Sequence, residues 1–313
     1  MKQKFKNAIL NSSILELTQF IKQKSISLGF TSCGISPVRE LSEQSKNLES
    51  WLVNNYHAEM TYMERNKEMR INSALLLDGA KSIISFTFNY FPQELQSSNT
   101  FQIAKYAYGD DYHKVLKDKL HTVLSELKAF DSSIDGRVFT DSAPILERAW
   151  AVESGLGWIG KNSLLIVPQK GSFFFLAEII LNKELEYDKP FFKNYCGTCS
   201  KCITACPTKA IIKDGIVDSR KCISYLTIEK KGEVTVSELA DTPYIFGCDI
   251  CQDVCPWNRF SKPQNEFVIN HTLKNLNKID FKNFTEKQFE SIAQNSPLKR
   301  AGFDKFKSTI SIK

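Results

Sequence analysis

The chain has 313 residues, with 41 Lys and Arg against 35 Asp and Glu and a formal net charge of +6. Its hydrophobic content of 42% is that of an ordinary globular protein, which excludes a disordered or collagen-like chain. No apolar run approaches the roughly 20 residues that cross a bilayer, and the basic start, Met1–Lys6, is not followed by an unbroken apolar stretch. We therefore expect a cytoplasmic protein of about two domains that contacts no membrane and keeps its cysteines reduced.

Hydrophobic periodicity and turn residues predict helices and strands without the regular alternation of a doubly wound sheet. In chain order, the patterns predict a helix over 13–28 ended by Gly29, a strand over 30–36, a helix over 48–56, a strand over 81–90, a short strand over 103–108, a helix over 112–130, a strand over 137–140, a helix over 144–154, and two strands, 163–168 and 172–181, joined by a hairpin turn at 169–171. This mixture predicts an α+β fold.

A glycine-rich turn, GLGWIG at 155–160, has the spacing G-x-G-x-x-G of dinucleotide-binding loops. The expected helix before it, the expected strand after it, and the lack of a suitably placed acidic residue about 20 positions later contradict that function. We expect the glycines to allow a close approach of the backbone to another group, and we do not expect a nicotinamide cofactor.

Eight of the nine cysteines lie within 60 residues, from Cys196 to Cys255, and Cys33 stands alone. The first run, at 196–207, reads CGTCSKCITACP, which is the C-x2-C-x2-C-x3-C-P spacing of a cubane iron–sulfur site. The second run, at 248–256, reads CDICQDVCP and lacks one cysteine, which Cys222 can supply. In this spacing the fourth cysteine ligates the other cluster.

Because the last cysteine of each run ligates the cluster of the other run, the eight cysteines divide into two sets of four. Cluster one takes Cys196, Cys199, Cys202 and Cys255, and cluster two takes Cys206, Cys222, Cys248 and Cys251. The alternative is a pair of Cys₄ zinc sites, which favour paired C-x2-C knuckles. Two [4Fe-4S] clusters would conduct electrons, and the 195 residues before them would hold the site where the electrons are used.

Several further motifs, in order along the chain, resemble those of the epoxyqueuosine reductase family. They are YAYGDDYH at 106–113, DSAPILER at 141–148, GLGWIGKNSLL at 155–165, and CISYLT at 222–227 between the two cysteine runs. The resemblance covers roughly residues 15 to 262. It implies a cobalamin-dependent oxidoreductase, related to reductive dehalogenases, that reduces epoxyqueuosine to queuosine at the wobble position of tRNA, the last step of queuosine biosynthesis.

The same resemblance implies a domain arrangement. A cobalamin-binding α/β domain of the reductive-dehalogenase or nitroreductase type is expected over 1–185, a ferredoxin-like domain with two [4Fe-4S] clusters over 186–262, and a C-terminal helical tail over 263–313. Many members of the family add helical repeats, so this chain resembles a short form. An external low-potential electron donor and tRNA carrying epoxyqueuosine are the implied partners.

Asp141 matches the proton donor of the family. A carboxylic acid donates a proton near neutral pH only if its pKa is raised from about 4, and we expect burial beside Ala143, Pro144 and Ile145 to raise it. The alternative from the local sequence is that Asp141 is the N-cap of the helix that begins near Pro144.

Other site residues follow from the resemblance alone. The expected cobalamin contacts are Arg65, Tyr106, Asp141, Asn162, Ser163, Leu165, Ser172 and Ser224. Arg148 is the expected substrate contact. No histidine is expected to ligate cobalt, and His113 is expected to be an ordinary surface or core residue, like the other three histidines.

The tail from residue 263 has nine Lys and Arg against five Asp and Glu, which is +4 of the net +6. This excess suits contact with RNA phosphates, and a solvated helix face explains it equally well. Its aromatic residues are expected in a core rather than as base-stacking platforms. Two other functions remain open: a related cobalamin and iron–sulfur reductase of a small molecule, and a non-catalytic two-cluster electron carrier.

Overall fold

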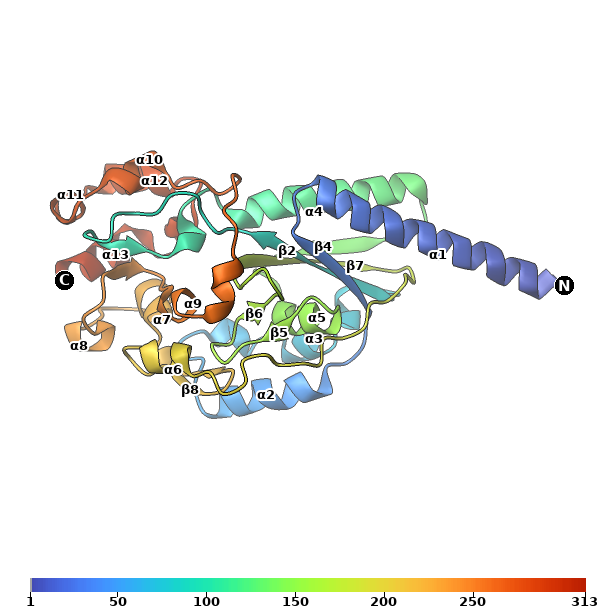
Figure 1. Cartoon of the computed structure of the whole chain (residues 1–313), viewed down its shortest axis with the longest axis horizontal. Coiled ribbons are helices and arrows are strands. Elements are labelled where there is room, and N and C mark those ends of the chain that lie inside the picture. The colour runs from blue at the N-terminus through green and yellow to red at the C-terminus, as the bar shows by residue number, and fades with distance from the viewer. Residues whose placement is uncertain (1) are drawn as a thin grey trace.

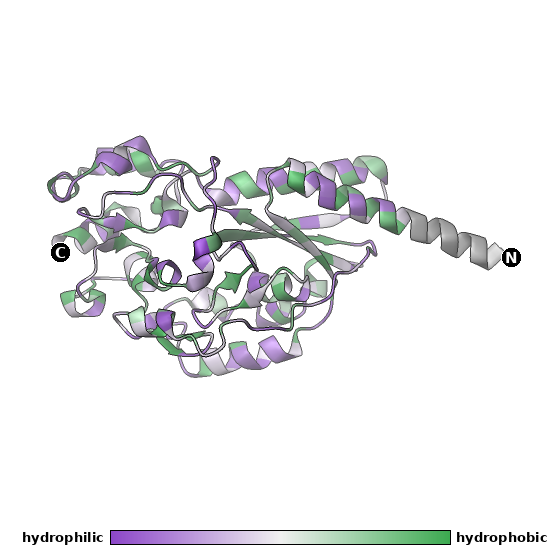
Figure 2. Cartoon of the chain, viewed as in Figure 1, coloured by the Kyte–Doolittle hydropathy of each residue, from purple (hydrophilic) through white to green (hydrophobic). Residues whose placement is uncertain are grey.

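The computed structural model describes residues 2–313, with side chains from Ser13 onward, so the side chains of the basic N-terminus lie outside the described part. The centre is an antiparallel sheet of four strands in the order β1-β2-β7-β4. Its strands are β1 (Ser32–Pro37), β2 (Ser82–Asn89), β7 (Phe174–Leu181) and β4 (Gly136–Phe139). Figure 2 shows these strands as a mostly hydrophobic layer inside the molecule.

Helices cover both faces of this sheet (Figure 1). On one face, α1 (Lys2–Ser27) and α4 (Tyr112–Phe130) pack against apolar side chains such as Phe86 and Ile179. On the other face, α5 (Glu147–Glu153) packs with Trp150 against Ile83. The remaining helices on that side are α2 (Ser42–Val53), η1 (Thr61–Met63), α3 (Lys67–Ile71) and η2 (Ser73–Leu76). The side chains of a strand alternate between the two faces, so each face has its own core. The α+β prediction is confirmed.

Several predicted elements differ from the structure. The helix expected over 13–28 begins at Lys2, and the helix expected over 48–56 lies at Ser42–Val53. The strand expected over 103–108 is only β3 (Gln102–Ile103), followed by the 3-10 helix η3 (Lys105–Ala107), because β3 pairs in parallel with β10 over two residues and then turns away. The helix expected from 144 begins at Glu147. The hairpin over 163–181 is also wrong: the turn closes through the bridge between Val167 and Gly171, but β6 (Leu165–Ile166) pairs with β5 (Trp158–Ile159) instead of β7.

The glycine-rich turn lies between α5 and β6 and contacts the chain itself. A Cβ on Gly157 would lie 2.1 Å from the carbonyl oxygen of Ile166, which is closer than real contacts allow. The glycine therefore permits the β5–β6 pairing. The expected close approach of the backbone is present, and its partner is a strand of the same chain.

The cysteine-rich segment has short helices and strands that lie against one side of the central sheet domain (Figure 1). They are α6 (Lys201–Ala205), β8 (Ile211–Lys213), β9 (Ile216–Val217), η4 (Ser219–Lys221), α7 (Ile223–Ile228), α8 (Val236–Leu239), β10 (Tyr244–Phe246), α9 (Ile250–Asp253) and η5 (Pro256–Phe260). The β3–β10 pairing attaches this segment to the loop before α4.

The tail has α10 (His271–Asn275), α11 (Lys278–Lys282), α12 (Glu286–Ala293), η6 (Pro297–Arg300) and α13 (Gly302–Ser311). Phe281, Phe284 and Phe306 are buried in one cluster with Phe101 and Phe246 of the earlier segments. The tail aromatics therefore form core, as expected. None of the described helices is long and apolar enough to span a bilayer.

Candidate active site

Asp141 lies in the loop between β4 and α5, with a left-handed backbone at φ 56°. Its Oδ2 accepts the Tyr112 hydroxyl at 2.6 Å and lies 3.2 Å from His113 Nε2. Tyr112 and His113 both belong to the first turn of α4. The N-cap of α5 is Leu146, which has no side-chain cap, so the alternative function of Asp141 as a helix cap is wrong.

His113 links two carboxylates. Its Nδ1 lies 2.7 Å from Asp111 Oδ1, and its Nε2 faces Asp141. Burial by itself would lower the pKa of His113, but the hydrogen bonds and charges of Asp111 and Asp141 outweigh burial and raise the pKa to about 9. At neutral pH this side chain is an imidazolium between two carboxylates. His113, expected as an ordinary surface or core residue, is half-buried and lies between these two carboxylates.

The pKa of Asp141 shifts in the direction opposite to the expected one. Burial would raise it, but the hydrogen bonds from His113 and Tyr112 outweigh burial and hold the pKa below its ordinary value. The side chain remains 59% exposed, so it faces the open side of the loop. In this environment the proton shared by the pair resides on His113.

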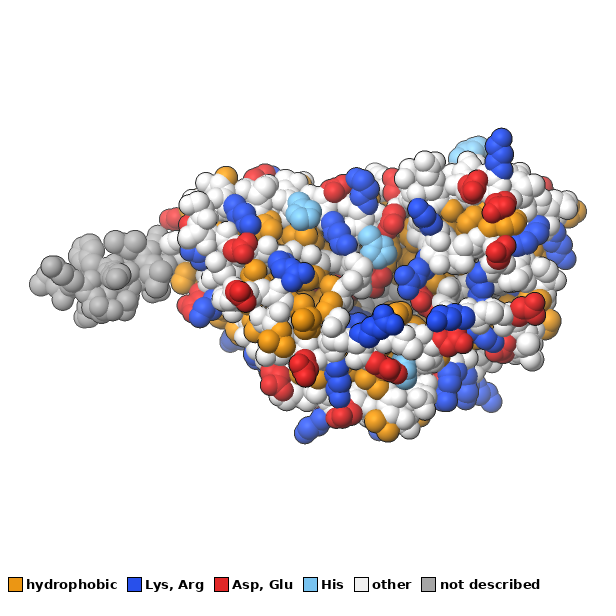
Figure 3. Space-filling view, turned by 180° about the vertical axis from the view of Figure 1, so that it is seen from behind, with side chains coloured by type: hydrophobic (Ala, Val, Ile, Leu, Met, Phe, Trp, Pro, Cys, Tyr) orange, Lys and Arg blue, Asp and Glu red, His pale blue; other side chains and the backbone are white. Residues whose placement is uncertain are grey.

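Groups from three other segments surround this cluster. Tyr106, which follows β3, packs its ring against Tyr112 and against Phe246 of β10. From the tail, Arg300 makes a two-pronged ion pair with Glu229, at 3.0 Å for both contacts, and its charge helps to lower the pKa of Asp141. Sequence analysis missed Arg300 because nothing local links the tail to this loop. Figure 3 shows a hollow near the middle of the rear face, with Lys, Arg and His side chains at its rim.

The structure places the remaining expected cofactor contacts in two environments. Ser163 and Ser224 are partly buried, and Arg65 is exposed in the loop between η1 and α3. Leu165 is 4% exposed and packs in a small apolar cluster, so its side chain supports the wall of the site from behind. Asn162 is also buried, and its side-chain nitrogen donates to the carbonyl of Cys251.

Ser172 connects the sheet domain to the cysteine-rich segment. Its hydroxyl accepts from Gln252 at 3.2 Å and from Asn258 at 3.0 Å, and its backbone N–H donates to Asn258 Oδ1 at 2.6 Å. Arg148 is exposed at the start of α5, and its guanidinium donates to the hydroxyl of Ser163 at 2.9 Å. Arg148 and Ser163 thus lie together, although they were expected in different roles.

The eight clustered cysteines are free thiols, and among the described residues no three His, Cys, Asp or Glu side chains are grouped closely enough to hold a metal ion. Burial and the charges of Cys196 and Cys199 raise the pKa of Cys255, which comes from the second run. Burial and the charges of Cys222 and Cys206 likewise raise the pKa of Cys248. These neighbours follow the crossed division made from the spacing. The helix of the first cysteine run, α6, packs against the helix of the second run, α9.

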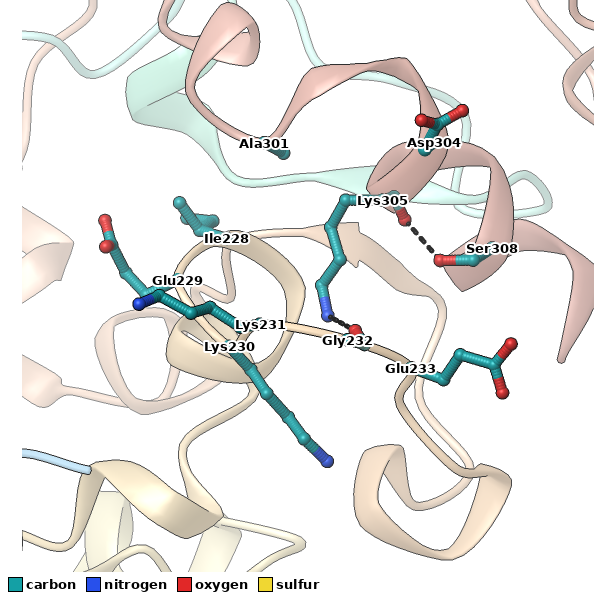
Figure 4. A pocket seen from close by; sticks show the side chains of 10 residues that line it. All are labelled: Ile228, Glu229, Lys230, Lys231, Gly232, Glu233, Ala301, Asp304, Lys305 and Ser308. Atoms are coloured by element: carbon teal, nitrogen blue, oxygen red, sulfur yellow. Dashed lines mark hydrogen bonds between the residues drawn. The ribbon is translucent and has the colours of Figure 1, made fainter. Parts of the chain in front are cut away.

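An open cavity of about 580 Å³ lies between the loop after α7 and the start of α13 (Figure 4). Three lysines and three carboxylates line it, and Lys305 donates to the carbonyl of Gly232 at 3.0 Å. Its charges balance, so the cavity does not favour an anion such as a phosphate over other ligands.

Two known protein families match parts of this chain. The 4Fe-4S double cluster binding domain matches residues 195–258, and the family described as "Epoxyqueuosine reductase QueG, DUF1730" matches residues 70–142. The epoxyqueuosine reductase of Cyclobacterium marinum is 48% identical over 303 residues, which are 96% of this chain and 97% of the relative. The chain belongs to the epoxyqueuosine reductase family. The enzyme of Escherichia coli is 38% identical over 95% of this chain and 80% of its own length.

Solved structures of the family share this fold. A crystal structure of selenomethionine-labelled epoxyqueuosine reductase has a TM-score of 0.86 at 26% identity, covering 95% of this chain and 80% of the other. Another, with a TM-score of 0.83, 26% identity and the same coverage, contains an epoxyqueuosine-modified tRNA-Tyr stem loop. In a Bacillus subtilis epoxyqueuosine reductase with a TM-score of 0.85, 26% identity and the same coverage, an aspartate catalytic loop is swung out of the active site. The predicted family, the oxidoreductase class and the double-cluster domain are confirmed.

Proposed function

We propose that this protein reduces epoxyqueuosine to queuosine in tRNA, with Asp141 as the proton donor. The observation that carries the proposal is the Asp141 loop, whose carboxylate meets Tyr112 and His113 beside a double-cluster domain in a chain of this family. The solved relative with a modified tRNA stem loop supports tRNA as the partner. We propose that the reaction takes place in the cytoplasm and that an external low-potential donor supplies the electrons.

The eight cysteines fit two [4Fe-4S] clusters, because their spacing in the sequence offers two sets of four thiols and none of them is consumed by a disulfide. We propose Cys196, Cys199, Cys202 and Cys255 as the ligands of cluster one, and Cys206, Cys222, Cys248 and Cys251 as those of cluster two. We also propose three domains, 1–185, 186–262 and 263–313, and the cysteine-rich segment forms the middle one.

The expected cofactor residues fit a large amide-bearing ring such as cobalamin. Tyr106, Ser163 and Ser224 keep part of their surface open, and Arg65 is exposed, whereas Asn162, Leu165 and Ser172 are buried behind them. We propose that the first group touches the cofactor with Asp141 and that the second holds the wall in place. Cobalamin, when bound, supplies a cobalt centre that accepts cluster electrons and reduces the epoxide.

The proton chemistry follows from the chain itself. Conversion of the epoxide to the alkene consumes two electrons and two protons and releases the oxygen as water. Asp141 stands at the exposed end of the hydrogen-bonded series Asp111–His113–Asp141, so the imidazolium of His113 supplies the proton that passes through the Asp141 carboxyl to the departing oxygen. Arg148, exposed on the same side of the loop, is the proposed substrate contact.

The deciding experiment supplies each proposed component. Protein with both clusters is mixed with cobalamin, dithionite and tRNA carrying epoxyqueuosine, and the digested RNA is examined by mass spectrometry of nucleosides. Queuosine should appear only when all components are present. Its absence from a sample with intact clusters and bound cobalamin contradicts the proposed function.

The role of Asp141 is tested with Asp141→Asn. Loss of the proton donor should lower kcat by about 10²–10⁴-fold without changing the cluster absorption spectrum. Asp118→Asn is the matched control, because Asp118 lies exposed on α4 and pairs only with Lys114 among the interactions described. Full turnover by Asp141→Asn would exclude this residue as the proton donor.

A further inference from the structure

A buried carboxyl lies in the central sheet behind the Asp141 loop. Glu178 is in the middle of β7, opposite Ser85 on β2 and Phe139 on β4, and its side chain is fully buried. Among the described residues, no N–H or hydroxyl donates a hydrogen bond to either of its oxygens. An ionised carboxylate is costly in such a place, so Glu178 requires a proton or a partner that supplies one.

The partner is the carboxyl of Glu147, the first residue of α5. Each of these two carboxyls acts on the pKa of the other, and two adjacent carboxyls can form a hydrogen bond only when one of them is protonated. Glu147 uses another contact to reach the loop: its Oε1 accepts the backbone N–H of Asp141 at 2.5 Å. Glu147 therefore joins the sheet interior to the residue proposed as the proton donor.

The charges around the pair favour a shared proton near neutral pH. Burial, and then the charge of Asp141, raises the pKa of Glu147 to about 8, while the positive charge of Arg148 opposes this shift. The pKa of Glu178 is raised further, also chiefly by burial. The facing residues of β2 and β4 are uncharged, and from α4 the imidazolium of His113 faces Asp141 on the far side of the loop.

We propose that Glu147 and Glu178 share one proton and act as a latch that holds the Asp141 loop, residues 140–146, in its inward position. With the shared proton in place, Glu147 keeps an oxygen for the N–H of Asp141, and this contact supports the left-handed backbone that aims the Asp141 carboxylate at Tyr112 and His113. A left-handed conformation is unfavourable for a residue with a Cβ and persists only where neighbours enforce it. Loss of the proton would leave two neighbouring anions, one of them fully buried, drive Glu147 away and release the loop.

The latch is a property of the folded chain, and only its consequence for turnover rests on the proposed function. The two carboxyls are positioning residues, since neither is proposed to touch the substrate. The latch can be absent from an enzyme that reduces epoxyqueuosine, and it can be present in a protein without that activity. Failure of the latch and failure of the proposed function are therefore distinguishable.

Hydrogen exchange of the 140–146 segment tests the latch in the full chain with both clusters, without tRNA. After correction for the intrinsic exchange rate, protection of the Asp141 amide in the wild type should fall about tenfold per pH unit above the pKa of the pair. Glu178→Gln and Glu147→Gln should abolish this fall, because the amide offers a permanent N–H to the remaining carboxylate. The infrared band of a protonated carboxyl should also disappear in both variants.

Glu153→Gln is the matched control, since it makes the same change on α5 at a residue that pairs with Arg39 instead of the loop. It should keep the pH dependence of the wild type. If Glu178→Gln does not fold, Glu147→Gln alone decides, because position 147 is at the start of a helix. His113 is unchanged in these variants, so an equal loss of protection in the wild type and in Glu147→Gln would assign the effect to His113 and overturn the latch.

Discussion

The behaviour of Asp141 depends on residues that are distant from it in sequence. The local string DSAP is typical of a helix start, yet Ile145 is buried in the cluster around Trp150 and the helix begins only at Glu147. The residues before Glu147 therefore form a loop, and this loop brings Asp141 to Tyr112 and His113. His113 and Tyr112 then determine the pKa of Asp141, in the direction opposite to what burial alone predicts.

The raised pKa of His113 predicts how stability changes with pH. The folded pKa of about 9 exceeds the ordinary value of about 6.5, so the stabilisation is fully present below pH 6.5 and is lost as the pH rises through 9. The difference in free energy of unfolding between the wild type and His113→Gln should therefore be largest near pH 6 and should shrink toward pH 9. Urea denaturation across this range measures it.

His121→Gln is the comparison for that experiment, because His121 is on the same helix and no hydrogen bond or ion pair is described for it. At pH 6 the free energy of unfolding of His121→Gln should differ from that of the wild type by less than about 0.5 kcal/mol, as is usual for an exposed residue. A difference that is constant with pH in His113→Gln would mean that this imidazole is not held charged by Asp111 and Asp141.

At the scale of elements, each of the two cysteine runs contains a short helix, α6 in the first run and α9 in the second. α6 and α9 pack against each other, and the charges of Cys196 and Cys199 act on the pKa of Cys255. The exchange of the last cysteines stays a prediction from the spacing, because three thiolates two residues apart converge on one cluster and the fourth points away. Strand pairing was less predictable: β6 and β7 are adjacent in sequence, yet β6 pairs with β5.

The crossed arrangement predicts which cluster each cysteine supports. Cys255→Ser should remove the cluster that Cys196, Cys199 and Cys202 hold and lower the iron content from about eight to about four atoms per chain. Electron paramagnetic resonance of the remaining cluster should match that of Cys199→Ser and differ from that of Cys251→Ser.

Cys33→Ser controls for the loss of a thiol as such, since burial raises the pKa of Cys33 and the residue lies in β1, in the core of the sheet domain. Its iron content should equal that of the wild type. If Cys255→Ser and Cys251→Ser lost the same resonance signal, the crossed assignment would be excluded.

At the scale of the whole molecule, the tail is part of the main body. Phe306 of α13 is fully buried in the cluster that also contains Phe246 of β10. The backbone N–H of Asp111 donates to the carbonyl of Asn295 at 2.6 Å, so the tail also supports the segment that carries His113. The boundary predicted at 263 is a change of composition, and the predicted division into three domains stays a prediction.

This shared core predicts one cooperative transition. Phe306→Ala should lower the free energy of unfolding by about 3–5 kcal/mol, the usual cost of a large cavity, and should shift a single transition observed by circular dichroism. Phe192→Ala, at a side chain that is 88% exposed, should change it by less than about 0.5 kcal/mol. An early separate transition in Phe306→Ala would show that the tail unfolds on its own.

The sequence by itself determined the features that depend on short-range spacing: the thiolate runs of the clusters, the amphipathic helix over 112–130, and the ordered motifs that identify the family. Such features are local because a few consecutive residues fix the geometry. Only the tertiary structure decided the state of Asp141, the proximity of Arg300, the charged His113 and the buried Glu147–Glu178 pair. Each of these depends on electrostatic contacts between segments that meet only after the sheet, α4, α5 and the tail have packed together.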